Sequence, residues 1–453
     1  MRRYGGVGRS VARFWADRRG NFAVIFGMIV AVLALAVGFG VDTAQLMNAK
    51  SALRNAVDAA VTSTARELTV RPATEEEARK WVAAFLTANS AGGILPHDDI
   101  VLDKLVVDKT AKTVTASAYV DVALYFPLFG QSNVKRIHNM GAAVYSDKHI
   151  EVAMMLDLTT SMEEDRRART NKIGDLKVAA AAAVSTFLDM NNANTPRIRV
   201  ALVPYSDGVN TGPLAHTVFR EAKGSTGKDD APPSLNAPQA VSVSDNCATE
   251  RKNSTGGGMD YSDAGPSMAL VNRDDRIETC PVAPLVPLTT DEDALLKAID
   301  QFKADGYTAG HIGVQWTRYL LSPSWRSVLE SAVPGSGPLE YTDNKAKKIA
   351  ILMTDGAFNT AFAGVSSSEK TRSNQKTRSQ NAARELCSRM KQDGIEIFTI
   401  GFMLAAGDQD VMSNCASPDT SGIKHYFLAA DGAALKTAFQ EIARNTERLA
   451  LTQ

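Results

Sequence analysis

Residues 150–162 read IEVAMMLDLTTSM, and this stretch predicts the fold of the larger part of the chain. Residues 150–156 form an almost continuous apolar run, which is typical of a strand buried on both faces of a parallel sheet. The run leads directly into Asp157, Thr159 and Ser161. Open α/β sheets bind their ligands at the carboxyl ends of their strands. The stretch therefore predicts a central strand and a polar site at its end.

The region around this strand alternates between strand-like and helix-like segments. Such alternation predicts a parallel sheet that is covered by helices on both faces. We therefore predict an α/β fold with a doubly wound, mostly parallel sheet over residues 149–453. The predicted strands are 150–156, 198–203, 347–356 with its closing turn, 395–402 and 425–429, and the predicted helices are 172–190, 292–303, 313–321, 379–391 and 433–449.

Between residues 206 and 290 this alternation breaks. The segment is rich in Gly, Pro, Ser, Asn and Asp, and a structureless loop of that length is uncommon in a compact domain. We therefore interpret 206–290 as an insertion in the α/β domain.

Residues 22–41 read FAVIFGMIVAVLALAVGFGV, twenty residues without a charge. As a helix they are long enough to cross a hydrocarbon core of about 30 Å. Residues 1–21 hold six arginines and one aspartate, and positively charged flanks stay in the cytoplasm. We predict a single transmembrane helix with a cytoplasmic tail and an exported main body. A signal peptide cleaved near Gly38-Phe39-Gly40 is the alternative.

Two segments separate this helix from the α/β domain. Residues 42–71 contain no Gly or Pro, and their apolar positions recur every three or four residues, which predicts a stalk helix with one apolar stripe. The stripe would pack either on another helix or on the chain's own next domain. Residues 72–148 combine a helical segment with three strand-like segments, which predicts a small α+β unit.

Composition excludes some classes of protein. Of the 453 residues, 44% are apolar and 22% are charged, which is ordinary for a globular chain and disfavours wholesale disorder. Fifty basic and fifty acidic residues leave no net charge. Nucleic-acid binding proteins carry a basic excess, so we expect no nucleic-acid partner.

The four cysteines all follow the predicted membrane helix, and export would place them where disulfides persist. No C-x-x-C pattern occurs, which disfavours a thiol zinc site or a redox motif. Of the three possible pairings we favour the sequence-local one, Cys247–Cys280 and Cys387–Cys415. Four buried free thiols are the alternative.

A second carboxylate follows a later strand. Residues 349–354 (IAILMT) end at Asp355-Gly356, so Asp157 and Asp355 are expected at the same edge of the sheet. Two carboxylates about 5 Å apart repel by roughly 3 kcal/mol at an effective dielectric near 20, and a cation between them removes that cost. The hydroxyl of Thr308, in a turn before a helix, can complete a set of oxygen ligands. Oxygen ligands suit hard divalent cations, Mg²⁺ above all.

These residues give the domain its resemblance to a von Willebrand factor A domain. That family has a metal-ion-dependent adhesion site built from a D-x-S-x-S pattern, a loop Thr and a loop Asp, and Thr stands at the middle position here. The resemblance implies a divalent cation, most often Mg²⁺, with Mn²⁺ or Ca²⁺ as alternatives. It also implies that a protein partner's carboxylate fills an open position on the ion. The implied ligands are Asp157, Thr159, Ser161, Thr308 and Asp355.

Residues 18–60 are similar to the membrane-anchored start of TadG-like proteins, which take part in assembling Flp (Tad) pili in bacteria. Pilin-like relatives are cut after a Gly and carry Glu five positions later. Here Ile25 stands five positions after Gly20, which disfavours processing by a prepilin peptidase. The resemblance implies a single-pass protein of the bacterial inner membrane, with its main body in the periplasm or outside the cell.

We therefore expect a binding and assembly protein and not an enzyme. Its expected partner is a pilus subunit or an envelope component that offers a carboxylate. One alternative is a structural scaffold with a vestigial metal site. Another is a metal-dependent hydrolase, which needs a general base beside a metal-bound water. No H-E-x-x-H or G-x-S-x-G pattern occurs, and His311, near Thr308 in the sequence, is expected to be structural.

Overall fold

The chain divides into two compact units, Met1–Ser146 and Asp147–Gln453. The computed structural model describes residues 21–70, 73–90, 100–126, 132–145, 148–165, 170–191, 196–215, 246–251, 258–265, 277, 279–342, 346–363, 373–420 and 422–452. The predicted cytoplasmic tail, except for its last residue, and more than half of the predicted insertion lie outside the described residues.

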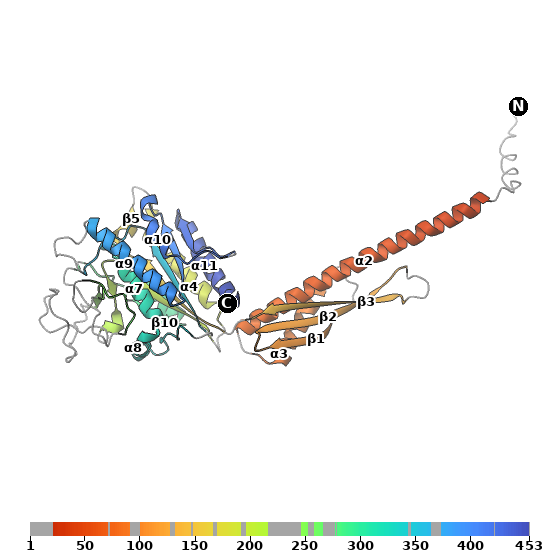
Figure 1. Cartoon of the computed structure of the whole chain (residues 1–453), viewed down its shortest axis with the longest axis horizontal. Helices are drawn as coiled ribbons and strands as arrows, with labels where there is room; N and C mark the ends of the chain where they lie inside the picture. Colours follow the sequence, from red (N-terminus) through yellow and green to blue (C-terminus); the bar gives the residue numbers. More distant parts are fainter. Residues whose placement is uncertain are drawn as a thin grey trace, which may run out of the picture. The chain divides into compact units, whose positions relative to one another are not determined.

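The first unit is built on one long helix, α2 (Asn21–Val70), which joins the predicted membrane helix and the predicted stalk without a break (Figure 1). Within it, Val24–Thr69 contains a stretch long and apolar enough, by length and composition, to cross a membrane. Side chains 24–37 are exposed, and cover by the rest of the unit begins at Gly38. Most of the apolar half of α2 therefore presents its side chains to the surroundings of the unit.

A second helix and a three-stranded antiparallel sheet complete this unit. The elements are α3 (Glu75–Ser90), β1 (Val101–Asp108), β2 (Thr113–Ala123) and β3 (Val134–Val144). Thr74 caps α3: its backbone N–H donates to the Glu77 carboxylate, and its hydroxyl accepts from the Glu77 N–H, a reciprocal pair that satisfies two free N–H groups at a helix start.

The stripe on α2 packs on the sheet of its own unit. Alternate side chains of β2 are buried, as expected for a sheet with one face on a core. Val114 and Val120 of that face share a core with Leu53, Val57 and Val61 of α2. Of the two alternatives for the stripe, the structure therefore shows packing on the chain's own next domain.

The second unit has the predicted α/β fold. Five parallel strands lie in the order β13-β12-β11-β4-β7. They are β4 (His149–Asp157), β7 (Ile198–Tyr205), β11 (Ala346–Thr354), β12 (Glu396–Phe402) and β13 (Tyr426–Ala429). The prediction of a doubly wound, mostly parallel sheet is confirmed.

Both faces of this sheet are covered by helices. Val152, Met154 and Leu156 of β4 point into one core, and Ala153 and Met155 point into the other, which explains the continuous apolar run. The first core is closed by α4 (Lys172–Leu188), α6 (Glu292–Asp300) and α11 (Gly432–Thr452). The second is closed by α7 (Gly310–Leu321), α8 (Arg326–Ala332), α9 (Ser373–Gln392) and α10 (Asp410–Cys415).

The structure describes parts of the predicted insertion 206–290. It contributes three short strands to the main sheet, beyond β7 or beside it: β8 (Val209–Asn210), β9 (Cys247–Ala248) and β10 (Val286–Thr289). These strands are antiparallel to their neighbours. These three strands thus extend the sheet. A further small antiparallel pair is formed by β5 (Glu164–Asp165) and β6 (Thr170–Asn171).

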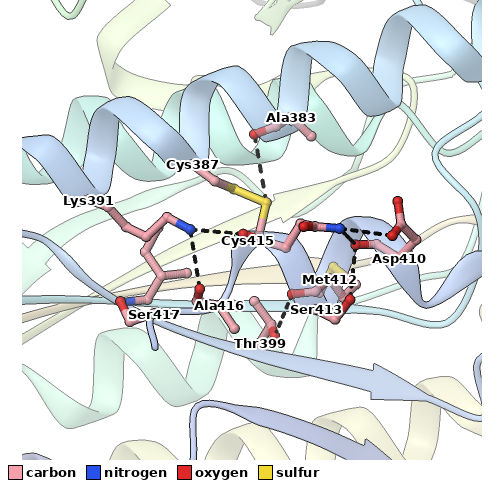
Figure 2. Close-up of a disulfide and its surroundings, with 12 residues drawn as sticks. Ala383, Cys387, Lys391, Thr399, Asp410, Met412, Ser413, Cys415, Ala416 and Ser417 are labelled. Carbon is pink, nitrogen blue, oxygen red and sulfur yellow. Dashed lines mark hydrogen bonds between the residues drawn. A yellow bond between two sulfur atoms is a disulfide. The ribbon is translucent and has the colours of Figure 1, made fainter. Parts of the chain in front are cut away.

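Both predicted disulfides are present. Cys247 of β9 is bonded to Cys280, and Cys387 of α9 is bonded to Cys415 at the end of α10. Figure 2 shows the second bond between the two helices, with the Lys391 ammonium donating to the Ala416 carbonyl beside it. The same ammonium donates to the Asn414 carbonyl at 2.8 Å. The sequence-local pairing is therefore confirmed, and the alternative of four free thiols is wrong.

Candidate functional site

The carboxyl ends of β4 and β11 bring the two predicted aspartates to one place. These strands are parallel neighbours, so Asp157 and Asp355 leave the sheet at the same edge. The Thr159 hydroxyl donates to Asp157 Oδ1 at 2.7 Å and lies 2.9 Å from the Ser161 hydroxyl. The Ser161 hydroxyl donates to Asp355 Oδ1 at 2.5 Å. An unbroken chain of oxygen atoms therefore links the two carboxylates.

Thr308 lies beside the same cluster. A methyl group added at Gly356 would lie 3.6 Å from the Ser161 hydroxyl and 4.0 Å from the Thr308 hydroxyl, so both face the small space next to that glycine. The Thr308 N–H donates to the Asn359 side-chain oxygen, and the Asn359 N–H donates back to the Thr308 carbonyl. The structure thus brings all five predicted site residues together.

The loop that carries Thr308 is fixed from its other side. The Tyr307 N–H donates to the Asp207 carboxylate at 2.5 Å, and the Ala309 N–H donates to the Ser206 carbonyl at 3.0 Å. Gly306 has a φ of +87°, a conformation that side chains rarely adopt. A Cβ there would also lie 2.7 Å from the Thr279 hydroxyl. Glycine is therefore required for the turn that presents Thr308.

Three further side chains contact the aspartates, and sequence reasoning did not find them. The hydroxyls of Tyr205 and Thr354 donate to Asp157 Oδ2 at 2.8 and 2.7 Å. The Lys172 ammonium, at the start of α4, donates to Asp355 Oδ2 at 2.8 Å. Thr354 directly precedes Asp355, so its place beside the site could have been predicted from the sequence. Tyr205 lies at the end of a strand and Lys172 at the start of a helix, both far from the aspartates in the sequence and outside any motif.

Burial and mutual repulsion make the negative charge of the two aspartates unfavourable. Asp157 is fully buried, and burial together with the charge of Asp355 raises the pKa of Asp157 to about 6, although hydrogen bonds from Thr159 and Thr354 oppose the shift. Burial and the nearby charge of Asp157 raise the pKa of Tyr205 well above its ordinary value, so its phenol stays protonated and donates. The two aspartates therefore favour any cation that approaches them.

The donor set fits a hard divalent cation. Two carboxylates and three hydroxyls offer oxygen alone, which suits Mg²⁺ or Ca²⁺ and not a thiol-seeking metal. Within the described residues, no group of three or more His, Cys, Asp or Glu side chains is placed to hold a metal ion. A cation here would therefore depend on the hydroxyl groups as well as on the acids, and the Lys172 ammonium already stands at Asp355 as an internal cation.

A Ser–His–Glu arrangement lies nearby, in the core behind α7. His311 contacts the Ser379 hydroxyl at 2.7 Å through Nδ1 and the Glu250 carboxylate at 2.8 Å through Nε2. Burial alone would raise the pKa of Glu250, but the hydrogen bond and charge of His311 hold it below its ordinary value. All three side chains are buried. They tie α7, α9 and the segment at 250 together, which supports the structural role expected of His311.

A known protein family matches the N-terminal part of the chain. The family described as "Putative Flp pilus-assembly TadE/G-like" matches residues 20–67, which confirms the resemblance found at the N-terminal helix. No curated protein matches the chain.

Several solved structures from pili resemble the chain at low identity. The vWF domain of the type V pili tip protein Mfa5 from Porphyromonas gingivalis is 14% identical, with a TM-score of 0.39 over 68% of this chain and 97% of that one. The pilus adhesin SpaC from Lactobacillus rhamnosus GG is 14% identical, with a TM-score of 0.36 over 78% and 35%. The PilB minor pilin from Streptococcus sanguinis is 11% identical, with a TM-score of 0.34 over 78% and 79%.

Proposed function

We propose that this chain is a membrane-anchored envelope protein of Flp (Tad) pilus assembly or adhesion, which binds a protein partner through a divalent-cation site and is not an enzyme. The family match to residues 20–67 supports the pilus role. The observation that carries the binding proposal is the chain of oxygens from Asp157 through Thr159 and Ser161 to Asp355. Such a set is assembled from strands far apart in the sequence, at the edge where α/β sheets bind ligands.

The five oxygen-bearing residues would hold the ion: Asp157, Thr159, Ser161, Thr308 and Asp355. A bound Mg²⁺, with Mn²⁺ or Ca²⁺ as alternatives, would supply a centre that accepts one carboxylate from the partner. The protein's own part is to hold the oxygens in place. Tyr205 and Thr354 orient Asp157 by donating to its second oxygen, and the Asn359 contact fixes the Thr308 loop.

The location follows from the N-terminal sequence. Residues 22–41 would span the bacterial inner membrane with the arginine-rich tail in the cytoplasm, and the main body would lie in the periplasm or outside the cell. Export is consistent with two disulfides in the second unit, because the bacterial periplasm is oxidising whereas the cytosol keeps thiols reduced.

The proposal is tested by capture of the partner. We expect envelope extracts of piliated cells to yield a specific protein bound to the wild-type chain in Mg²⁺, and we expect chelator to release it. Asp157→Asn should lose the partner in either condition, whereas Asp293→Asn, an exposed acid on α6 away from the site, should behave as wild type. Capture that persists equally in chelator and in Asp157→Asn would contradict the proposal.

The contact between Lys172 and Asp355 favours a second candidate, a scaffold in which the lysine has taken the place of the ion. The two candidates differ in what happens when Lys172 is removed. If the site binds metal, the ammonium competes with it for Asp355. If the site is vestigial, the ammonium is a fixed structural partner of a buried carboxylate.

Lys172→Met should therefore raise Mg²⁺ affinity by about tenfold or more, since 1.4 kcal/mol of removed repulsion already gives a factor of ten. In chelator the same variant should have a lower melting temperature than the wild type, because Asp355 loses its counter-ion. Calorimetric titration and thermal melting measure the two effects. Lys177→Met is the matched control, because Lys177 lies on the same helix and donates to the Asp300 carbonyl and not to an acid. A lower melting temperature of Lys172→Met without any uptake of Mg²⁺ would favour the scaffold.

A further inference from the structure

The first residue that packs on helix α2 from the small α+β unit contacts it inside the apolar segment that would cross the membrane. The ring of Phe126 lies against Gly38, so closely that a Cβ at Gly38 would fall 2.6 Å from a ring carbon. Gly38 lies three residues before the end of the apolar segment 22–41. At 1.5 Å per helical residue, Phe126 contacts the helix about 5 Å inside that end.

The segment that carries Phe126 is held firmly at this level. The Asp42 carboxylate, buried beneath the segment, accepts hydrogen bonds from the N–H groups of Tyr125 at 2.9 Å and Phe126 at 3.0 Å. The Gln45 side chain donates to the Ala123 carbonyl at 3.2 Å. The end of β2 is therefore fixed to α2 at the point where the apolar segment gives way to charged and polar residues.

The aromatic side chains at this point remain largely exposed. Tyr125 is 71% exposed and Phe126 is 54% exposed, and Val134, which pairs with Ala123 across the sheet, is also exposed. We use the name aromatic tip for Tyr125 and Phe126. The exposed side chains 24–37 of α2 continue from it toward the N-terminus, so the tip borders the apolar surface of the helix that is long and apolar enough to cross a membrane.

The helix cannot slide to keep the tip out of the bilayer. Twenty residues are the length needed to cross the hydrocarbon core. If the embedded segment began earlier in the chain, it would include Arg18 and Arg19. If it ended later, it would include Asp42. Charged side chains in hydrocarbon are costly. The depth of α2, and with it the level of the tip, is fixed at both ends by charge.

From this geometry we infer that Tyr125 and Phe126 insert into the interfacial layer of the lipid bilayer, on the side that carries the small α+β unit. Aromatic side chains concentrate at membrane–water interfaces because a ring can face hydrocarbon while its edge stays near the headgroups. The unit is thereby seated on the lipid surface, and α2 does not act as a free stalk. This inference rests on the transmembrane part of the proposed function and is independent of the cation site.

The test uses the full chain in phospholipid vesicles, with one cysteine introduced at a time. The native cysteines form disulfides, so each new thiol can be labelled selectively. Tyr125→Cys probes the tip, and Val32→Cys, 64% exposed in the middle of the apolar segment, probes membrane crossing itself. Met140→Cys is the matched control, because Met140 is a 69% exposed apolar residue on β3, about 20 Å along the strand from Val134.

We expect a water-soluble maleimide to modify Tyr125→Cys about tenfold more slowly than Met140→Cys in vesicles, and at a similar rate after unfolding. Tenfold protection corresponds to ~1.4 kcal/mol. A nitroxide at position 125 should in turn be more accessible to oxygen than to an aqueous nickel chelate. Equal modification of positions 125 and 140, with position 32 protected, would overturn the inference and leave the transmembrane anchor standing.

Two other outcomes also decide against it. If position 32 is modified as fast as position 140, the helix does not cross the bilayer, and the inference falls together with the anchor. If position 125 is protected and nitroxides there couple between copies of the chain, the tip packs on a second copy and not on lipid.

Discussion

Asp157→Asn should lower the affinity for Mg²⁺ by on the order of 100-fold or more, because changes in the shell around a metal ligand alone often cost 10–100-fold. The amide keeps the shape of the side chain but removes the charge that would face the cation. Asp355→Asn should have a comparable effect, since the two carboxylates are linked through Thr159 and Ser161. Calorimetric titration of the full chain measures both, with Asp293→Asn as the unaffected acid.

The same substitution should change how stability depends on pH in the absence of metal. The pKa of Asp157 is raised to about 6 from an ordinary value of 3.8. A carboxyl group with a raised pKa stabilises the fold fully below its unfolded pKa, and that contribution is lost as the pH rises through the folded value. Between about pH 4 and pH 7 the loss amounts to roughly 3 kcal/mol at most.

The difference between wild type and Asp157→Asn isolates this contribution from other titrating groups. In chelator, the wild-type chain should fall in stability relative to Asp157→Asn as the pH rises from 4 to 7, so that the variant is the more stable of the two at pH 7. Saturating Mg²⁺ should reverse the order. Parallel pH profiles of the wild type and Asp157→Asn would mean that Asp157 titrates as an ordinary carboxyl group. Undiminished uptake of Mg²⁺ by both Asp157→Asn and Asp355→Asn would refute the cation site.

The part of this site that sequence reasoning predicted depends on local patterns. The apolar run 150–156 marks a strand buried on both faces, and the polar residues after it must then lie at the end of that strand. The same reasoning applies to Asp355 after β11. Because neighbouring parallel strands end at one edge, two local patterns were enough to predict a contact between residues almost 200 positions apart.

The parts that were missed have no local pattern. Lys172 reaches Asp355 from the first turn of α4, and Tyr205 reaches Asp157 from the end of β7. A lone lysine or tyrosine at the end of an element is common, and only the packed fold shows what it contacts. The strands β8, β9 and β10 are two to four residues long and lie among Gly, Pro and Asn residues, so their strand signal is weaker than the loop signal around them.

Removal of the disulfide Cys387–Cys415 should produce the largest loss of stability. The bond closes a loop of 28 residues, and on the chain-entropy model such a loop contributes about 3–4 kcal/mol. Both cysteines are fully buried in the core between α9 and α10, so Cys387→Ala with Cys415→Ala also leaves a small cavity, which adds to the cost.

Cys247→Ala with Cys280→Ala provides the comparison that separates these two contributions. Its loop of 33 residues gives nearly the same entropic contribution, about 3–4 kcal/mol, but Cys280 is only partly buried, so less packing is lost. We expect the melting temperature to fall on the order of 10 °C for either pair, and to fall further for Cys387→Ala with Cys415→Ala. A reducing agent should lower the wild-type melting temperature and leave the corresponding transition of a variant that lacks both bonds unchanged. A wild-type chain that melts at the same temperature with and without reductant would show that neither bond stabilises the fold. The position of α10 against α9 would then depend on packing and hydrogen bonds, such as those of Lys391 to the Asn414 and Ala416 carbonyls.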